Sequence, residues 1–318
     1  RRDRTPQDLF EAACDGDRAA LARLLSLVER GGDDARVIGR LASPRGGSGY
    51  TVGLTGAPGA GKSTLTSALI RHLRGQDIEV AVLAIDPSSP FTGGAILGDR
   101  VRMQDHATDP GVFIRSMATR GHLGGLSLST PEAVRLLDAV GKRWILVETV
   151  GVGQVEVEIA GKADTTVVVV NPGWGDSVQA NKAGLMEIAD VFVINKADRK
   201  GAEETRRDLE QMLDLSDLGE EAWRPPIVSA VATTGDGVSE VWEAVLGHRE
   251  RISASGELER RRAFRTREEL REIVVRRLEQ RARELATGDR GDELTQRVID
   301  RDLDPWGAAD EMLGGIGA

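Results

Sequence analysis

The chain has a single cysteine, Cys14, among its 318 residues. One cysteine excludes an internal disulfide framework and any metal site built from several thiolates, and it fits a reducing compartment such as the cytoplasm. No apolar run approaches the roughly 20 residues that a membrane-spanning helix needs. Aromatic residues make up 3% of the chain, which is too few for the stacking platforms of single-strand nucleic-acid binders.

Positive charge is also scarce. The net charge is −9, and no tract rich in lysine and arginine occurs. The composition therefore predicts no nucleic-acid partner and no binding to a membrane surface. Six of the 42 basic residues are lysines, so each lysine is worth locating individually.

Short β-branched runs dominate the middle of the chain. Between Tyr50 and Ala230 they alternate with segments of helix length, and they are apolar at nearly every position. Such runs predict a mostly parallel sheet that is covered on both faces. We therefore expect a doubly wound α/β domain. The runs are YTVGLT, EVAVLAID, GVFIRSM, WILVET, TTVVVV, DVFVIN and PPIVSA.

Helical segments flank this domain on both sides. Thr5-Pro6 offers an N-cap and a first-turn proline for two short helices, and residues 43–49 have the composition of a flexible linker. After about Arg249 the chain is charged and helical to its end. We expect an N-terminal helical extension over residues 1–44, a nucleotide-binding domain over 45–250 and a C-terminal helical arm over 251–318.

The arm carries an apolar stripe on an otherwise charged helix. A stripe of this kind needs a surface that covers it, and a second copy of the chain would supply one. The sequence thus predicts a homodimer formed through the arm, and folding back onto the chain's own sheet is the alternative. The stripe consists of Leu270, Ile273, Val274, Leu278 and Leu285.

A phosphate-binding loop follows the first strand. Residues 56–63 read GAPGAGKS and fit the pattern GxxxxGK[ST], with a strand before it and a helix after it. Backbone N–H groups of such a loop surround phosphates, the lysine reaches the β and γ oxygens, and the serine hydroxyl can bind Mg²⁺. The predicted nucleotide-binding residues here are Gly56, Ala57, Pro58, Gly59, Ala60, Gly61, Lys62, Ser63 and Thr64.

Acidic residues end two of the predicted strands. Asp86 ends EVAVLAID, and Glu148 ends WILVET. Parallel strands all end at the edge where the ligand lies, and Mg²⁺ prefers oxygen ligands. With a phosphate loop at this edge, both acids are candidates for the magnesium shell together with Ser63.

A guanine-reading tetrapeptide follows a later strand. Residues 195–198 read NKAD, which fits N-K-x-D. The Asp198 carboxylate can accept hydrogen bonds from N1–H and the 2-amino group of guanine, whereas adenine would leave it unpaired. Asn195 would brace the site and Lys196 would lie along the base. Ser229 and Ala230, which end the next strand, can present a backbone N–H to guanine O6.

The order of these motifs resembles the MeaB/ArgK family. The specific stretches are GAPGAGKST, DPSSPFTGG, RGHLGGLS, ETVGVGQ and NKAD, and the similarity runs from about Leu9 to Gly247 and more loosely into the helical C-terminus. Members are P-loop GTPases of the SIMIBI class and act as chaperones for adenosylcobalamin-dependent acyl-CoA mutases. The resemblance implies that Mg²⁺, GTP and GDP are the ligands and that a mutase of the methylmalonyl-CoA type is the partner.

The resemblance also implies roles for individual residues. Glu148 corresponds to the Walker B acid, which faces Mg²⁺ through water, and residues 149–154 correspond to switch II. Asp86 and Asp99 correspond to acids of the magnesium and switch I region. Lys182 matches a lysine of a mobile third switch and, with Lys62 and Glu148, completes the candidate catalytic set. The alternative for Lys182 is a solvated lysine at a helix start.

Two other functions use similar motifs. A small-molecule kinase would use the same P-loop, but it has no need for a guanine-reading NKAD. A metal-insertion GTPase needs a cluster of histidine and cysteine, and the four histidines lack metal-ligand spacing. The D-x-H-x-x-G pattern of cobalamin binding is missing too, so we expect any cobalamin to be bound by the partner. Arg120 and His122 are weaker candidates for contacts with phosphate or partner, because loop residues of this kind are usually solvated.

Overall fold

The computed structural model describes residues 4–87, 104–106, 108–119, 129–149, 162–173, 186–215 and 222–314, with the backbone alone at 86, 87, 104, 118 and 119. The chain divides into two compact units, Arg1–Arg262 and Ala263–Ala318. The boundaries predicted after residues 44 and 250 stay predictions.

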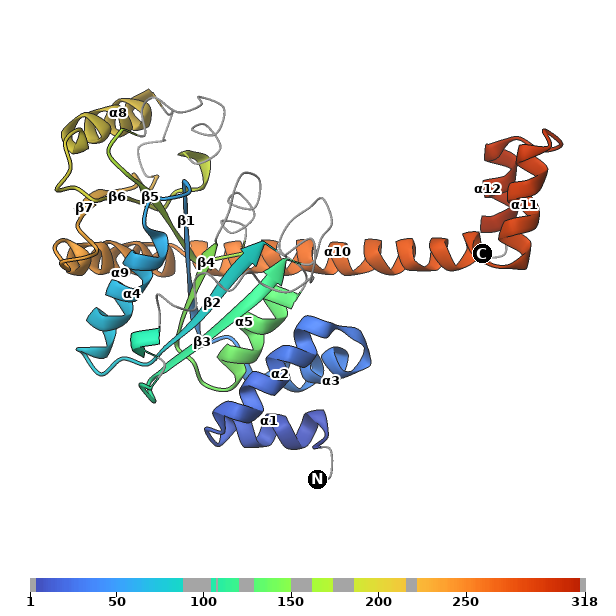
Figure 1. Ribbon diagram of the computed structural model, residues 1–318, viewed down its shortest axis with the longest axis horizontal. Coiled ribbons are helices and arrows are strands. Elements are labelled where there is room, and N and C mark those ends of the chain that lie inside the picture. The colour runs from blue at the N-terminus through green and yellow to red at the C-terminus, as the bar shows by residue number, and fades with distance from the viewer. Residues whose placement is uncertain are drawn as a thin grey trace. The chain divides into compact units, whose positions relative to one another are not determined.

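The first unit is built on a seven-stranded sheet in the order β3-β2-β4-β1-β5-β6-β7 (Figure 1). Every pairing between its strands is parallel, which confirms the predicted doubly wound α/β fold. We call the edge where the strands end the carboxyl edge and the opposite one the amino edge. The strands are β1 (Tyr50–Gly56), β2 (Val80–Pro87), β3 (Val112–Thr119), β4 (Trp144–Thr149), β5 (Thr165–Val170), β6 (Val191–Asn195) and β7 (Ile227–Ala230).

Helices cover both faces of the sheet. On one face α4 (Lys62–Arg74) and α9 (Val238–Ala254) pack on Val52 and Leu54 of β1. On the other face α5 (Ser129–Ala139) packs on Ile145 and Val147 of β4 (Figure 1). Because neighbouring side chains of one strand enter different cores, a central strand is apolar at consecutive positions. A third apolar cluster joins β5 and β6 to α8 (Ala202–Leu215).

Three helices precede the sheet, where the sequence analysis predicted two. The helices are α1 (Pro6–Cys14), α2 (Arg18–Arg30) and α3 (Gly32–Ala42). A capping box between Thr5 and Asp8 starts α1. The third helix begins directly after Gly31, whose φ of 77° reverses the chain without a spacer. Apolar residues of all three helices belong to the core on the α5 face, so this extension is packed on the sheet.

The glycine-rich segment before β1 differs from the flexible linker that its composition predicted. Asp138 of α5 accepts hydrogen bonds from the backbone N–H groups of Gly47 and Gly49, the latter at 2.6 Å. A Cβ on Gly49 would lie 2.9 Å from that carboxylate. The glycines therefore let the backbone approach a carboxylate closely, and the segment is held in place.

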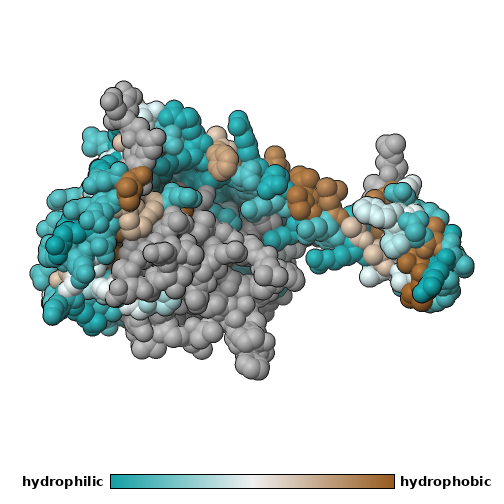
Figure 2. Space-filling view, turned by 90° about the horizontal axis from the view of Figure 1, so that it is seen from above, coloured by the Kyte–Doolittle hydropathy of each residue, from teal (hydrophilic) through white to brown (hydrophobic). Residues whose placement is uncertain are grey.

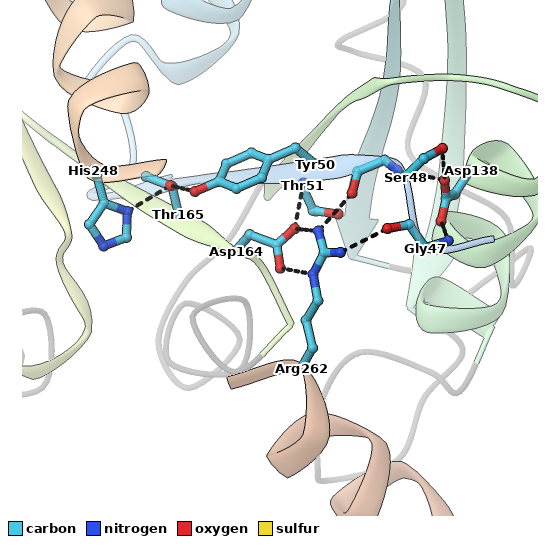
Figure 3. A network of polar contacts seen from close by, with 10 residues as sticks. Gly47, Ser48, Tyr50, Thr51, Asp138, Asp164, Thr165, His248 and Arg262 are labelled. Atoms are coloured by element: carbon cyan, nitrogen blue, oxygen red, sulfur yellow. Dashed lines mark hydrogen bonds and ion pairs between the residues drawn. The ribbon is translucent and has the colours of Figure 1, made fainter. Parts of the chain in front are cut away.

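Buried polar groups meet at the amino edge (Figure 3). Asp164 accepts from Thr51 N at 3.0 Å and from two nitrogens of Arg262, at 3.0 and 2.7 Å. Arg262 also donates to the carbonyls of Gly47 and Gly49, at 3.1 and 2.7 Å. The starts of β1 and β5 and the loop before β1 are thus joined to the first turns of α10 (Glu257–Ala286).

A second set of buried groups lies beside this one. Thr165 Oγ1 lies 2.6 Å from the Tyr50 hydroxyl and 2.8 Å from His248 Nδ1. Burial raises the pKa of Tyr50 to about 12. Asp190 accepts from Arg261 at 3.0 Å. Although burial by itself would raise the pKa of Asp190, its contacts with His248 and Arg261 hold that pKa below its usual range.

The second unit contains the rest of α10 and the helices α11 (Asp289–Ile299) and α12 (Pro305–Leu313). The sequence predicted a helical tail without dividing it into separate helices. The structure has a break at residues 300–304, where Asp304 caps α12 by accepting from Trp306 N at 2.9 Å. Figure 2 shows apolar side chains exposed on α10 and on the α11–α12 pair. In the described residues, no helix is long and apolar enough to cross a membrane.

Candidate nucleotide-binding site

The P-loop joins β1 to α4 at the carboxyl edge, and its backbone requires glycine. Gly56 has a φ of 133°, and a Cβ there would lie 1.9 Å from the carbonyl oxygen of Val169 in β5. Gly61 has a φ of 94°, and a Cβ there would lie 2.3 Å from the side-chain nitrogen of Asn195. The tip from Ala57 to Gly59 is exposed or half-exposed. Ligand phosphates can therefore reach the backbone N–H groups of the loop.

Two lysines approach the loop from different elements. The buried Lys62, at the start of α4, donates to the carbonyl of Gly56 and, at 3.2 Å, to that of Ala57. Lys196, which follows β6, donates to the carbonyl of Gly59 at 2.7 Å. Its φ of 61° is unusual for a residue with a side chain. Two positive charges therefore lie against the loop, one on each of these elements.

Ser63 and Glu148 meet beside the loop. The Ser63 hydroxyl donates to Glu148 Oε1 at 2.5 Å, and Glu148 is 1% exposed. The register explains the contact, because Leu54 of β1 pairs with Glu148 of β4. A hydroxyl and a carboxylate are both hard oxygen donors, so this pair fits a magnesium ion. Asp86 is the last residue but one of the next strand, β2, at the same edge.

The base-reading segment is bonded to the phosphate loop. Asn195 Nδ2 donates to the carbonyl of Ala60 at 2.9 Å and lies 3.4 Å from that of Gly61. Asn195 Oδ1 accepts from the backbone N–H of Ala232 at 3.1 Å. Asn195 is buried, whereas Asp198 is exposed. These hydrogen bonds hold Asn195 where the sequence predicted a bracing residue. The Asp198 carboxylate, predicted to read the base, is accessible to a ligand.

The end of β7 completes this side of the site. Ala230 pairs with Asn195 across the β6–β7 register, and its carbonyl accepts from Ala197 N at 3.1 Å. Ser229 Oγ accepts from Arg206 of α8 at 3.0 Å. The sequence analysis did not identify Arg206 or Ala232, because neither belongs to a motif with fixed spacing.

The structure brings most of the predicted site residues together at the carboxyl edge. The Asp86 side chain, Asp99 and Lys182 lie outside the described residues, as do Arg120, His122 and residues 150–154 of the predicted switch II. Among the residues that are described, no group of three or more His, Cys, Asp and Glu side chains could hold a metal ion.

Comparison with known proteins decides the family. Residues 21–287 match the family model of the methylmalonyl-CoA mutase-associated GTPase MeaB. The chain belongs to this family. It is therefore a P-loop GTPase, and the resemblance inferred from its motifs is confirmed.

Individual relatives of this MeaB-family GTPase agree. A protein of Pyrococcus abyssi that carries a GTPase name is 52% identical over 314 residues and covers 97% of both chains. The GTPase ArgK of Escherichia coli is 39% identical over 251 residues, which cover 77% of this chain and 76% of ArgK. A crystal structure titled LAO/AO transport system kinase superposes with a TM-score of 0.71 over 98% of both chains at 24% identity. That likeness shows the fold alone.

Proposed function

We propose that this GTPase is a chaperone that gates cofactor loading and protection of a cobalamin-dependent acyl-CoA mutase such as methylmalonyl-CoA mutase. The family description, which names a mutase-associated GTPase, supports the partner class. The bonds from Asn195 to Ala60 and Ala232 support guanine nucleotides as the ligand, because they join the phosphate loop to the base-reading segment. We place the chaperone in the cytoplasm.

In this proposal the P-loop residues Gly56–Thr64 hold the phosphates. Lys62 exchanges its carbonyl partners for the β and γ oxygens of GTP. Asp198 accepts from the Watson–Crick edge of guanine, with Asn195, Lys196, Ser229 and Ala230 forming the rest of the base site. Adenine would cover the Asp198 carboxylate without offering it a donor, which would penalise the wrong base.

A magnesium ion would be held by the Ser63 hydroxyl, with Glu148 acting through a water molecule. Asp86 and Asp99 are the further proposed acids of this shell. When bound, Mg²⁺ neutralises charge on the β and γ phosphates. The contact between Ser63 and Glu148 supports this assignment, since both are oxygen donors and lie 2.5 Å apart.

Hydrolysis would proceed by in-line attack of water on the γ-phosphate. Lys62 and Lys182 are proposed to stabilise charge on the transferring group. Lys182→Ala should then lower the turnover of bound GTP, chiefly when it is stimulated by the partner, with GTP affinity nearly unchanged. If affinity falls and turnover does not, Lys182 binds the ground state.

The test of the ligand compares GTP with ATP by isothermal titration calorimetry in the presence of Mg²⁺. Tight binding of GTP and weak binding of ATP would support the assignment. Equal binding of the two would contradict the base site and favour the small-molecule kinase. Neither arm requires knowledge of the partner.

The test of the partner mixes the chain with the adenosylcobalamin-dependent acyl-CoA mutase of the same organism. Complex formation is measured with GDP and with a non-hydrolysable GTP analogue. A partner that prefers one nucleotide state must change nucleotide affinity by the same factor. Nucleotide affinity that does not change on adding mutase, together with no complex in either state, would refute the chaperone role.

We further propose that the C-terminal arm joins two copies of the chain. On α10, Leu270, Val274 and Leu278 are 62%, 47% and 63% exposed, so an apolar stripe is available for a partner helix. Light scattering on the full chain should give a dimer, and a chain ending at Arg262 should give a monomer. A dimer that survives this truncation would exclude the arm as the main contact.

A further inference from the structure

Arg206 lies beside the base site without belonging to any of its motifs. It is the fifth residue of α8, the helix that begins four residues after Asp198. Its guanidinium donates from Nη1 to the carbonyl of Ile227 at 2.9 Å and from Nη2 to Ser229 Oγ at 3.0 Å. The Arg206 side chain is 29% exposed, and Nη1 also lies 4.0 Å from Glu210 Oε1. Arg206 thus joins α8 to two points on β7.

The strand β7 packs against α9 as well as α8, but its ladder is short. It has four residues and lies at one edge of the sheet, so it pairs with β6 alone. An edge strand of this length is held weakly by its ladder. At its far end, a Cβ on Gly237 would lie 2.1 Å from the carbonyl oxygen of Ser229. The chain after β7 therefore returns in close contact with Ser229, and a shift of Ser229 would move it too.

The guanidinium is suited to this position by its shape. Its two donors leave one plane at a fixed angle and can bridge a carbonyl and a hydroxyl that belong to residues two apart. The ammonium of lysine is a compact charge with three rotating donors, so it would not fix the angle between the two acceptors as the planar guanidinium does. The contact therefore fixes the direction of the strand as well as its distance from α8.

We infer that Arg206 is a positioning residue for base selection. By holding Ser229 and Ile227, it sets where the end of β7 presents its backbone to guanine O6, while Asp198 reads the neighbouring N1–H and 2-amino group. This inference rests on the proposed role of Ser229, Ala230 and Asp198 in guanine binding. Among the described residues, Arg206 makes no contact with the phosphate loop. We therefore expect phosphate binding by the loop to be independent of Arg206.

The experiment measures dissociation constants of GDP, IDP and ADP by calorimetry on the full chain, for the wild type and for Arg206→Leu, Arg206→Lys and Arg207→Leu. Arg207 is the matched control: it is exposed, and its Nε donates to the Glu203 carbonyl of its own helix. We expect Arg206→Leu to lower the ratio of GDP affinity to ADP affinity by about tenfold, which corresponds to the loss of one to two hydrogen bonds. ADP affinity should stay constant.

A merely structural role predicts a different pattern. If Arg206 only stabilised the fold, its loss would lower the melting temperature and leave the ratio of GDP to ADP affinity unchanged. That result, in a wild type that does prefer GDP, would overturn the inference. Arg206→Lys should fall between wild type and Arg206→Leu, and it provides the readout if the leucine variant does not fold.

Ser229, which accepts a hydrogen bond from Arg206, gives an independent check. Ser229→Ala removes the hydroxyl that Arg206 holds, so its effect on the GDP to ADP ratio should not add to that of Arg206→Leu in the double variant. Full additivity would contradict action through Ser229. A wild type without any preference for GDP would instead refute the proposed base site, which separates the two failures.

Discussion

Charged side chains at the two edges of the sheet have different kinds of partner. At the amino edge, buried carboxylates meet guanidinium groups: Asp164 binds Arg262, and Asp190 binds Arg261. At the carboxyl edge, the lysines at positions 62 and 196 donate to backbone carbonyls of the P-loop, and Asp198 is exposed. Both edges are polar ends of the same parallel strands, yet the partners of their charges differ in kind.

This difference separates stability from function. A carboxylate that is buried against a guanidinium loses much when its partner is removed, because the remaining charge stays desolvated. A lysine bonded to a neutral carbonyl can exchange that partner for phosphate oxygens, which form the stronger charge-assisted bonds. The amino edge should therefore respond to mutation in folding stability, and the carboxyl edge in nucleotide binding.

The largest expected effect is at the amino edge. Arg262→Ala removes both bonds to Asp164, which is 1% exposed, and should lower the free energy of unfolding by about 3 kcal/mol. Urea denaturation followed by circular dichroism measures this change. GDP affinity of the folded variant at 25 °C should remain that of the wild type.

Arg260→Ala is the matched control for this prediction. Arg260 lies two residues earlier, its side chain is 65% exposed, and it pairs with Glu257 on the same helix. Exposed pairs of this kind contribute well under about 1 kcal/mol. Equal losses of stability in the two variants would mean that the buried Asp164 contact has no special role.

The next effect tests the other edge. Lys62→Ala should weaken GTP binding by about a hundredfold, because charge-assisted hydrogen bonds to the β and γ phosphates are lost. The melting temperature without nucleotide should change little. Lys200→Ala, at an exposed position after the base-reading segment, is the control. Retained GTP affinity in the Lys62 variant would show that the loop does not bind phosphate as proposed.

The sequence predicted the carboxyl edge far better than the amino edge. The seven apolar runs identified in the sequence became the seven strands, and the P-loop, Glu148 and NKAD meet where parallel strands end. These features follow from local spacing. The bond between Arg262 and Asp164 joins residues 98 positions apart, so no spacing indicated it. Strand order and the third N-terminal helix depend likewise on packing between distant segments.

A smaller effect is expected at the base-reading segment than at the phosphate loop. Asp198→Asn removes the acceptor for the 2-amino group of guanine, so GTP affinity should fall about tenfold. Affinity for xanthosine triphosphate should rise, because the new amide can donate to the keto group at that position. A competition assay with the two nucleotides measures the change. An unchanged preference would place the base away from Asp198.

The smallest expected effect concerns His106, which ends a short 3₁₀ helix, Gln104–His106, beside α4. Its Nε2 is 2.9 Å from the hydroxyl of Ser67, midway along α4. Burial lowers the pKa of His106, and the positive charge of Arg71 acts in the same direction, whereas the hydrogen bond with Ser67 and the charges of Asp105 and Asp109 act against this shift. The unfolded chain therefore takes up a proton near pH 6.5, whereas the folded chain does so at lower pH, and stability should fall as pH drops below about 6.5. His106→Gln removes this titration, so its melting temperature should decline less between pH 8 and pH 5.5 than that of the wild type or of His72→Gln. Equal declines in all three proteins would show that protonation of His106 does not contribute to the pH dependence of stability.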